Sequence, residues 1–150
     1  MKLEEKINES IKDSMKEKNS LRLDSLRAIK SAILIEKTKS GSNDQIEDSV
    51  ILNILQKMVK QRNESAKIYL EQNRKEIAEV ELSQAKIISE FLPIQLSQSE
   101  LSEIIDKVIE EVGAKSMKDM GKVISKVNEK VSGQAEGRVI AEIIKTKLMI

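Results

Sequence analysis

The sequence predicts an all-α protein, with an N-terminal helical bundle of about four helices followed by a small three-helix tail domain. Along nearly the whole chain, apolar residues recur three and four positions apart, which places them on one face of a helix. No stretch alternates apolar and polar residues with the period of two that a strand requires. The composition agrees, because the 150 residues are 34% charged and contain one Tyr, one Phe and no Trp.

Four helices account for the first 92 residues. Asn19 or Ser20 can cap the second helix, and a polar segment at 39–44 is the clearest internal loop. The predicted core-facing residues are Leu3, Ile7, Ile11 and Met15 in a first helix over about 2–18; Leu26, Ile29, Ile33 and, at the edge, Leu34 in the second; Ile46, Val50, Ile54, Leu55, Met58, Ala66 and Tyr69 in a third over about 45–72; and Ile77, Val80, Ile87, Ile88 and Phe91 in a fourth over about 75–91.

Pro93 is the only proline, and it predicts the end of the fourth helix near Phe91 or Leu92. Ser97 and Glu100 then form the pattern of a capping box, and Gly113 can stop the helix that follows. Ser116 and Asp119 open a further helix, which Gly133 can end. The sequence therefore predicts two domains, 1–92 and 97–150. In the second, the predicted core-facing residues are Leu101, Ile104, Ile105, Val108, Ile109 and Val112, then Met117, Met120, Val123, Ile124, Val127 and Val131, and finally Val139, Ile140, Ile143, Ile144 and Leu148.

Several classes of function are excluded by the residues that are missing. The chain has no Cys and no His, which rules out disulfides, zinc sites built from thiolates or imidazoles, and every mechanism that needs either residue. There is no glycine-rich phosphate loop. We therefore predict no catalytic residues, no metal and no cofactor. The first ten residues contain acids and no apolar run, and no later stretch is long and apolar enough to span a membrane. The cytoplasm is the expected location.

Charge is segregated in the last third of the chain. Residues 97–113 hold five acids and one lysine, a net charge of −4, whereas residues 114–150 hold eight Lys or Arg and four acids, a net charge of +4. Four lysines recur every fourth residue and are expected to form a basic stripe roughly 120° wide on one helix. They are Lys118, Lys122, Lys126 and Lys130, with Lys115 just ahead of them.

Three glycines accompany this stripe. Gly121 lies inside the predicted helix, where glycine costs about 1 kcal/mol relative to alanine, so a neighbouring helix or a ligand is expected to come close. Gly133 and Gly137 bracket the tripeptide Gln134–Glu136. They either end one helix and begin the next, or leave backbone amides free to meet phosphate.

The kind of nucleic acid that such a surface could hold is restricted. Unstacked bases need aromatic platforms, which this chain lacks. It also lacks the long basic helix that reads a major groove in DNA. Recognition of structured RNA by its shape and phosphates remains.

Five motifs occur in an order that resembles the YqeY family through essentially the whole chain: LRAIKSAI, KMVKQRNES, EFLPIQLSQSEL, MKDMGKVISKV and SGQAEGRVIAEIIK. The C-terminal module of that family is similar to the tail domain of the B subunit of the tRNA-dependent amidotransferase, a helical module that contacts tRNA while the chemistry is done elsewhere. The resemblance thus implies a role near tRNA and an association with glutamine-dependent carbon–nitrogen ligation. It points to Lys118, Gly121, Lys122, Gly133, Ala135 and Gly137. The tail motif usually has a basic residue where this chain has Gln134.

Two hypotheses follow. In the first, the protein is a non-catalytic accessory module that binds tRNA, alone or within an amidotransferase or aminoacyl-tRNA synthetase complex. In the second, the basic tail binds an acidic protein partner and no RNA. Neither hypothesis involves a membrane or DNA, and catalysis by this chain alone is disfavoured because no reactive group was found. The candidate RNA-binding residues are Lys115, Lys118, Gly121, Lys122, Lys126, Lys130, Gly133, Ala135, Gly137 and Arg138.

Overall fold

The computed structural model of the protein describes residues 2–39, 41 and 46–149. These residues form seven α-helices, one short 3₁₀ helix and no strand, which confirms the all-α prediction. The chain divides into two compact units, Met1–Leu92 and Pro93–Ile150. The first contains α1 (Leu3–Lys16), α2 (Ser20–Lys39), α3 (Asp48–Glu71) and α4 (Lys75–Ser89); the second contains α5 (Gln98–Val112), η1 (Met117–Asp119), α6 (Met120–Lys130) and α7 (Gly137–Leu148).

That residues 1–92 and 97–150 fold as separate domains stays a prediction. Most of the predicted loop at 39–44 lies outside the described residues. The third helix begins at Asp48, three residues later than expected.

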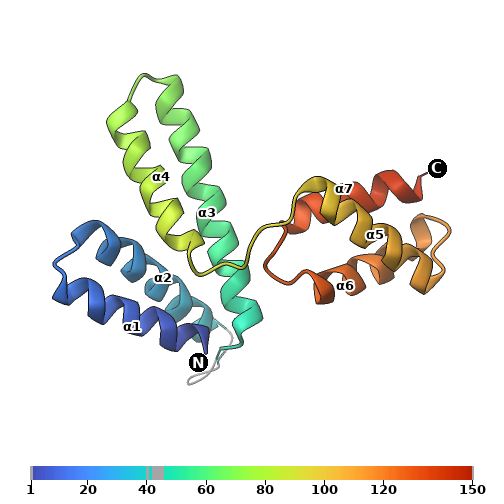
Figure 1. Cartoon of the computed structure of the whole chain (residues 1–150), viewed down its shortest axis with the longest axis horizontal. Helices are drawn as coiled ribbons and strands as arrows, with labels where there is room; N and C mark the ends of the chain where they lie inside the picture. Colours follow the sequence, from blue (N-terminus) through green and yellow to red (C-terminus); the bar gives the residue numbers. More distant parts are fainter. Residues whose placement is uncertain (1, 40, 42–45, 150) are drawn as a thin grey trace. The chain divides into compact units, whose positions relative to one another are not determined.

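Two helical hairpins build the first unit (Figure 1). Three residues join α1 to α2 and three join α3 to α4, and such short connections make consecutive helices antiparallel neighbours. Each connection contains one residue in the left-handed conformation, Lys18 with φ 56° and Asn73 with φ 59°. Asparagine tolerates this conformation better than most residues because its short side chain bonds locally.

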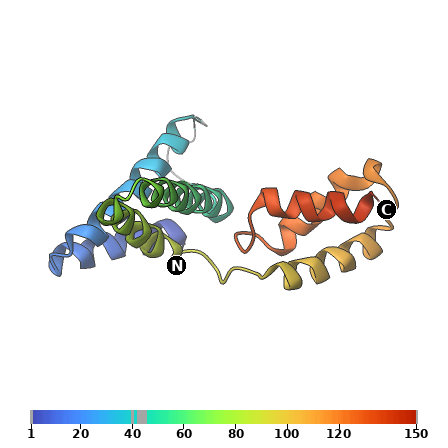
Figure 2. The same cartoon turned by 90° about the horizontal axis from the view of Figure 1, so that it is seen from above.

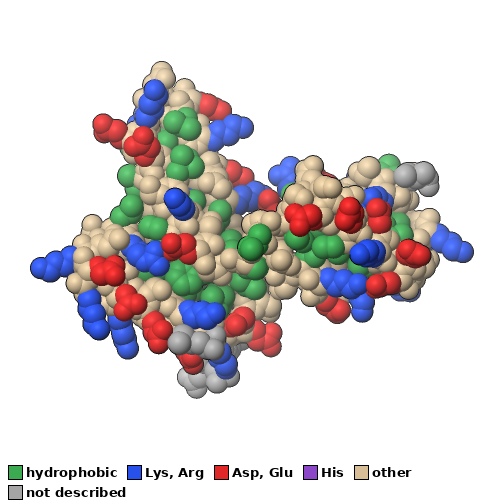
Figure 3. Space-filling view, viewed as in Figure 1, with side chains coloured by type: hydrophobic (Ala, Val, Ile, Leu, Met, Phe, Trp, Pro, Cys, Tyr) green, Lys and Arg blue, Asp and Glu red, His purple; other side chains and the backbone are tan. Residues whose placement is uncertain are grey.

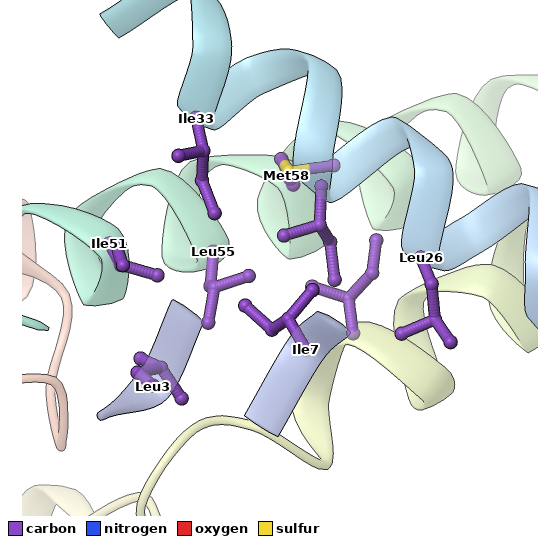
Figure 4. Close-up of a cluster of buried hydrophobic side chains, with 9 residues drawn as sticks. Leu3, Ile7, Leu26, Ile33, Ile51, Leu55 and Met58 are labelled. Atoms are coloured by element: carbon purple, nitrogen blue, oxygen red, sulfur yellow. The ribbon is translucent and has the colours of Figure 1, made fainter. Parts of the chain in front are cut away.

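The two hairpins bury one apolar core, much of which is labelled in Figure 4. Leu26, Ile29 and Ile33 of α2 are buried as predicted, and Leu55 and Met58 of α3 meet them there. The complete set of buried residues in this cluster is Leu3, Ile7, Leu26, Ile29, Ile33, Ile51, Leu55, Met58 and Ile88.

Some predicted core positions are wrong, for a geometric reason. A spacing of four residues drifts about 40° around the helix at each step. By Met15 the stripe of α1 has turned away from the core, so Met15 is 55% exposed and Ser14 is buried beside it. Leu34 and Val80 are also exposed, at 61% and 48%. Ile51, which was not predicted, is fully buried.

Small residues allow α3 and α4 to pack closely. The register of this pair is fixed by a hydrogen bond in which Nε of Arg62 donates to Oε1 of Gln84 at 3.1 Å. Ala66, Ala78 and Ala85 are buried along these two helices. At the far end of the hairpin, the guanidinium of Arg74 stands 5.5 Å from the ring centroid of Tyr69, a cation–π arrangement.

The second unit is a three-helix core (Figures 1 and 2). As predicted, Ser97 and Glu100 form a capping box at the start of α5, and Gly113 ends α5 with φ 68°. Each helix buries or partly buries the stripe that its sequence predicts, except that Val112 and Met117 are exposed, at 37% and 40%. The buried residues are Leu101, Ile105, Val108, Val123, Val127, Val131, Ile140, Ile144 and Leu148.

Candidate functional site

The start of the basic stripe is shaped by two side chains that bond to the backbone. Asp119 Oδ2 accepts a hydrogen bond from the backbone N–H of Lys115 at 3.0 Å. Ser116 Oγ accepts one from the backbone N–H of Lys118 at 3.4 Å. These bonds wind residues 117–119 into η1, which runs directly into α6. The predicted helix start at Ser116 is therefore a 3₁₀ turn, and α6 itself begins at Met120.

Three lysines lie at this start, and all three are exposed. In the part of the chain that the structure describes, no carboxylate lies within 4.0 Å of the ammonium groups of Lys115, Lys118 or Lys122. They present positive charge to solvent and are available to an anionic ligand.

The carboxylate of Asp119 lies among these lysines. The backbone N–H of Lys115 lowers the pKa of Asp119 most strongly. Desolvation, the next largest effect, raises it, and the backbone N–H of Ser116 and the charges of Lys122 and Lys118 each lower it by less. Because the pKa falls below its ordinary value of 3.8, Asp119 is ionised at neutral pH. It offsets part of the positive charge at the start of α6.

The other end of the predicted stripe is engaged within the protein. Nζ of Lys130 donates to both carboxylate oxygens of Glu111 on α5 at 3.0 Å. Lys126 has a looser partner, Glu129, at 3.9 Å between Nζ and Oε2, and both side chains are largely solvated. An exposed pair of this kind contributes little, so Lys126 can exchange its partner for another anion.

Ion pairs between helices explain the charge segregation of the second unit. Glu111 pairs with Lys130 of α6, and Asp106 pairs with Lys147 of α7 at 2.7 Å. The acidic α5 therefore neutralises part of the charge on the two basic helices. Acidic and basic side chains accordingly lie interspersed on the face of this unit seen in Figure 3.

Gly121 does not have the close neighbour that the sequence indicated, and Gly137 also has open space beside it. Gly121 lies in the first turn of α6 and is exposed, and a Cβ added there would meet nothing within 4 Å. The prediction that Gly121 packs against a neighbouring helix is therefore wrong. Gly137 opens α7, and a Cβ added to it would also meet nothing within 4 Å.

The loop 131–136 is held by the segment that follows Pro93. Gly133 is buried with φ 77°, a conformation that favours glycine. Its carbonyl accepts from Nε2 of Gln95 at 2.8 Å, and the backbone N–H of Leu96 donates to the carbonyl of Gln134 at 2.9 Å. Nε2 of Gln134 donates in return to the carbonyl of Ile94 at 3.4 Å. This reciprocal pairing, which the sequence did not reveal, gives the loop a fixed shape.

The remaining candidate residues lie around this loop. Ala135 is half-buried and packs against the core of the second unit. Arg138 is exposed on the first turn of α7, and its Nε lies 3.4 Å from Oε1 of Glu142. Gln134, at the position where the tail motif usually carries a basic residue, has an amide that bonds to backbone.

A family model described as Yqey-like protein matches residues 4–148. The chain belongs to the YqeY family. The YqeY motifs FLPIQLS and SGQAEG, nearly 40 residues apart, are the two sides of the pairing between residues 94–96 and 133–134. Their role in this YqeY protein is thus at least structural.

This YqeY chain is similar to a protein from Clavispora lusitaniae. The protein named Altered inheritance of mitochondria protein 41, mitochondrial, from Clavispora lusitaniae is 29% identical over 123 residues, which cover 79% of this chain and 70% of that protein. Among the described residues of this YqeY chain, no helix has the length and hydropathy of a membrane span, and no group of three acidic side chains could hold a metal ion.

Proposed function

We propose that this YqeY protein is a non-catalytic accessory module whose second unit binds structured RNA, with tRNA as the first candidate. The observation that carries the proposal is the group of unpartnered, exposed lysines at the start of α6, Lys115, Lys118 and Lys122, with Lys126 one turn further on. Lysine ammonium groups bind phosphate as compact point charges. The tRNA class rests on the resemblance of this unit to the amidotransferase tail domain.

Binding by phosphate contacts predicts modest affinity. Four contacts give a salt slope of about −3.6, which corresponds to a loss of roughly a hundredfold in affinity between ~50 and ~200 mM salt. Such an interaction is useful mainly inside a larger assembly, such as an amidotransferase or aminoacyl-tRNA synthetase complex. We place the protein in the cytoplasm, without a cofactor, and expect no amidotransferase activity from this chain alone.

A second candidate function is binding of an acidic protein partner. It is favoured by the carboxylates that already pair with this surface, Glu111 with Lys130 and Glu142 with Arg138. Capture of a partner that survives nuclease treatment would support this alternative, whereas capture lost with nuclease supports RNA.

The test is a titration of labelled total tRNA, followed by fluorescence anisotropy at ~50 and ~200 mM salt. Changing Lys115, Lys118 and Lys122 together to Gln should remove three contacts, so that the salt slope falls from about −3.6 to about −0.9. The matched control changes Lys12, Lys16 and Lys57 to Gln, which are three exposed lysines of the first unit. The control should bind like the wild-type chain.

Two results would count against this assignment. If the control loses as much affinity as the triple variant, the attraction comes from overall charge and not from α6. If the wild-type chain shows no saturable binding at micromolar concentration, the isolated protein does not bind tRNA.

Asp119 provides an independent check with the opposite sign. Asp119→Asn keeps an oxygen that can accept the hydrogen bond from Lys115 but removes a negative charge beside Lys118 and Lys122. We expect tRNA affinity at ~50 mM salt to rise about two- to fivefold, the range typical of one exposed charge pair. Weaker binding by a variant with an unchanged melting temperature would place the RNA elsewhere.

A further inference from the structure

One face at the start of α6 combines lysines with small residues. Positions three and four apart lie on one side of a helix, and here they are occupied by Lys118, Gly121, Lys122, Ser125 and Lys126, all exposed. We call these five residues the lysine–glycine face. The helical period puts Gly121 and Ser125 along one flank of the row of lysines, so they leave a low surface beside the lysine side chains.

Nothing inside the protein requires glycine at position 121. A Cβ at Gly121 would meet nothing within 4 Å, and its backbone is not in the left-handed region. Alanine would be the better helix former at this position. The fold therefore gives no reason for the missing side chain, whereas a ligand backbone that comes close to the helix would give one.

The spacing of the lysines indicates the shape of that ligand. Four residues advance about 6 Å along an α-helix, and slightly more where part of the step is 3₁₀. Adjacent phosphates along one strand of A-form RNA have a similar separation, shorter than in B-form DNA. Lys118, Lys122 and Lys126 can therefore contact three consecutive phosphates of one strand.

We propose that the lysine–glycine face receives the backbone of one strand of an A-form RNA stem, which lies against Gly121 and Ser125 alongside the row of lysines. This rests on the proposed function and specifies its ligand as duplex RNA. The contact is short, because Glu129 closes the face at one end and Asp119 lies at the other. One stem strand of about three phosphates is its natural footprint.

Two variants test the proposal without changing net charge. Lys122→Ser combined with Ser125→Lys moves one ammonium group off the regular spacing, and position 125 is exposed. It should lose one contact, or about tenfold in affinity at ~50 mM salt. Gly121→Leu places a bulky side chain on the path of the strand, with Gly121→Ala as its control. Gly121→Leu and Gly121→Ala should both melt at or above the wild-type temperature, because leucine and alanine form helix better than glycine.

The probes are a short blunt-ended RNA duplex, a DNA duplex of the same sequence, and one single strand of that RNA. We expect the RNA duplex to bind most tightly, Gly121→Leu to weaken it at least fivefold, and Gly121→Ala to change it less than twofold. Equal binding of the three probes overturns the proposal, as does wild-type affinity in both the exchanged and the Gly121→Leu variants.

These measurements distinguish a failure of the lysine–glycine face from a failure of the proposed RNA-binding function. If the triple lysine variant loses tRNA while the exchanged variant and Gly121→Leu retain it, the proposed function stands and the lysine–glycine face is rejected. If the wild-type chain binds none of the RNA probes, both fail together.

Discussion

Ile105→Ala is expected to unfold the second unit at temperatures where the wild-type chain is fully folded. The side chain of Ile105 is completely buried in the three-helix core, among residues from α5, α6 and α7. Truncating a buried isoleucine to alanine costs about 2–5 kcal/mol, because apolar contact is lost and a cavity remains. A unit of this size has a stability of only about 3–9 kcal/mol, so the change removes much of it.

Urea denaturation followed by far-UV circular dichroism measures this effect, with hydrogen exchange to locate it. Amides of α5, α6 and α7 should lose protection in the variant, and those of the first unit should not. The control is Ile94→Ala, the same chemical change at a side chain that is 87% exposed, for which we expect a shift within about 0.5 kcal/mol. Equal destabilisation by the two variants would contradict the core described above.

Ala78→Leu is expected to destabilise the first unit by about 1–3 kcal/mol, through the opposite defect. Ala78 is fully buried along the α3–α4 pair. Three added carbon atoms cannot fit there unless the helices separate. Separation would also disturb the hydrogen bond between Arg62 and Gln84, which fixes the register of the pair.

The matched control is Val80→Leu, on the same helix at a side chain that is 48% exposed. Thermal unfolding of both variants gives the comparison, and the control should melt close to the wild-type temperature. A variant at position 78 as stable as the control would mean that α3 and α4 are less tightly packed than the buried alanines indicate.

The features predicted best from sequence are those decided by neighbouring residues. Ser97, Glu100 and Gly113 mark the ends of α5 through bonds and dihedral angles within a few residues of each other. The burial of Ile105 and Val108 follows from the helical period alone. In the first unit the same period was less informative, because Ile51 faces the core in preference to Val50 and the stripe of α1 turns away at Met15.

The features that could not be predicted depend on residues far apart or on where a helix begins. Gln95 bonds to Gly133 across 38 positions, and no local pattern announces such a pair. The sequence pattern predicts a helix interior at Gly121 because it gives no sign of η1, whereas Gly121 lies in the exposed first turn of α6. The spacing places Lys130 in one stripe with Lys118 and Lys122, although Glu111 of another helix pairs with it. A small residue such as Ser125, four positions after Gly121, was the available signal for the shared face.

The position of Tyr69 has a practical consequence for spectroscopy. It is the only tyrosine, there is no tryptophan, and the single phenylalanine also lies in the first 92 residues. Absorbance and fluorescence in the near ultraviolet therefore report on the first unit alone, through a ring that the guanidinium of Arg74 faces. The second unit contributes almost no absorbance or fluorescence in the near ultraviolet. A tryptophan introduced at an exposed position of α7 would give it a signal of its own, read against an almost empty background.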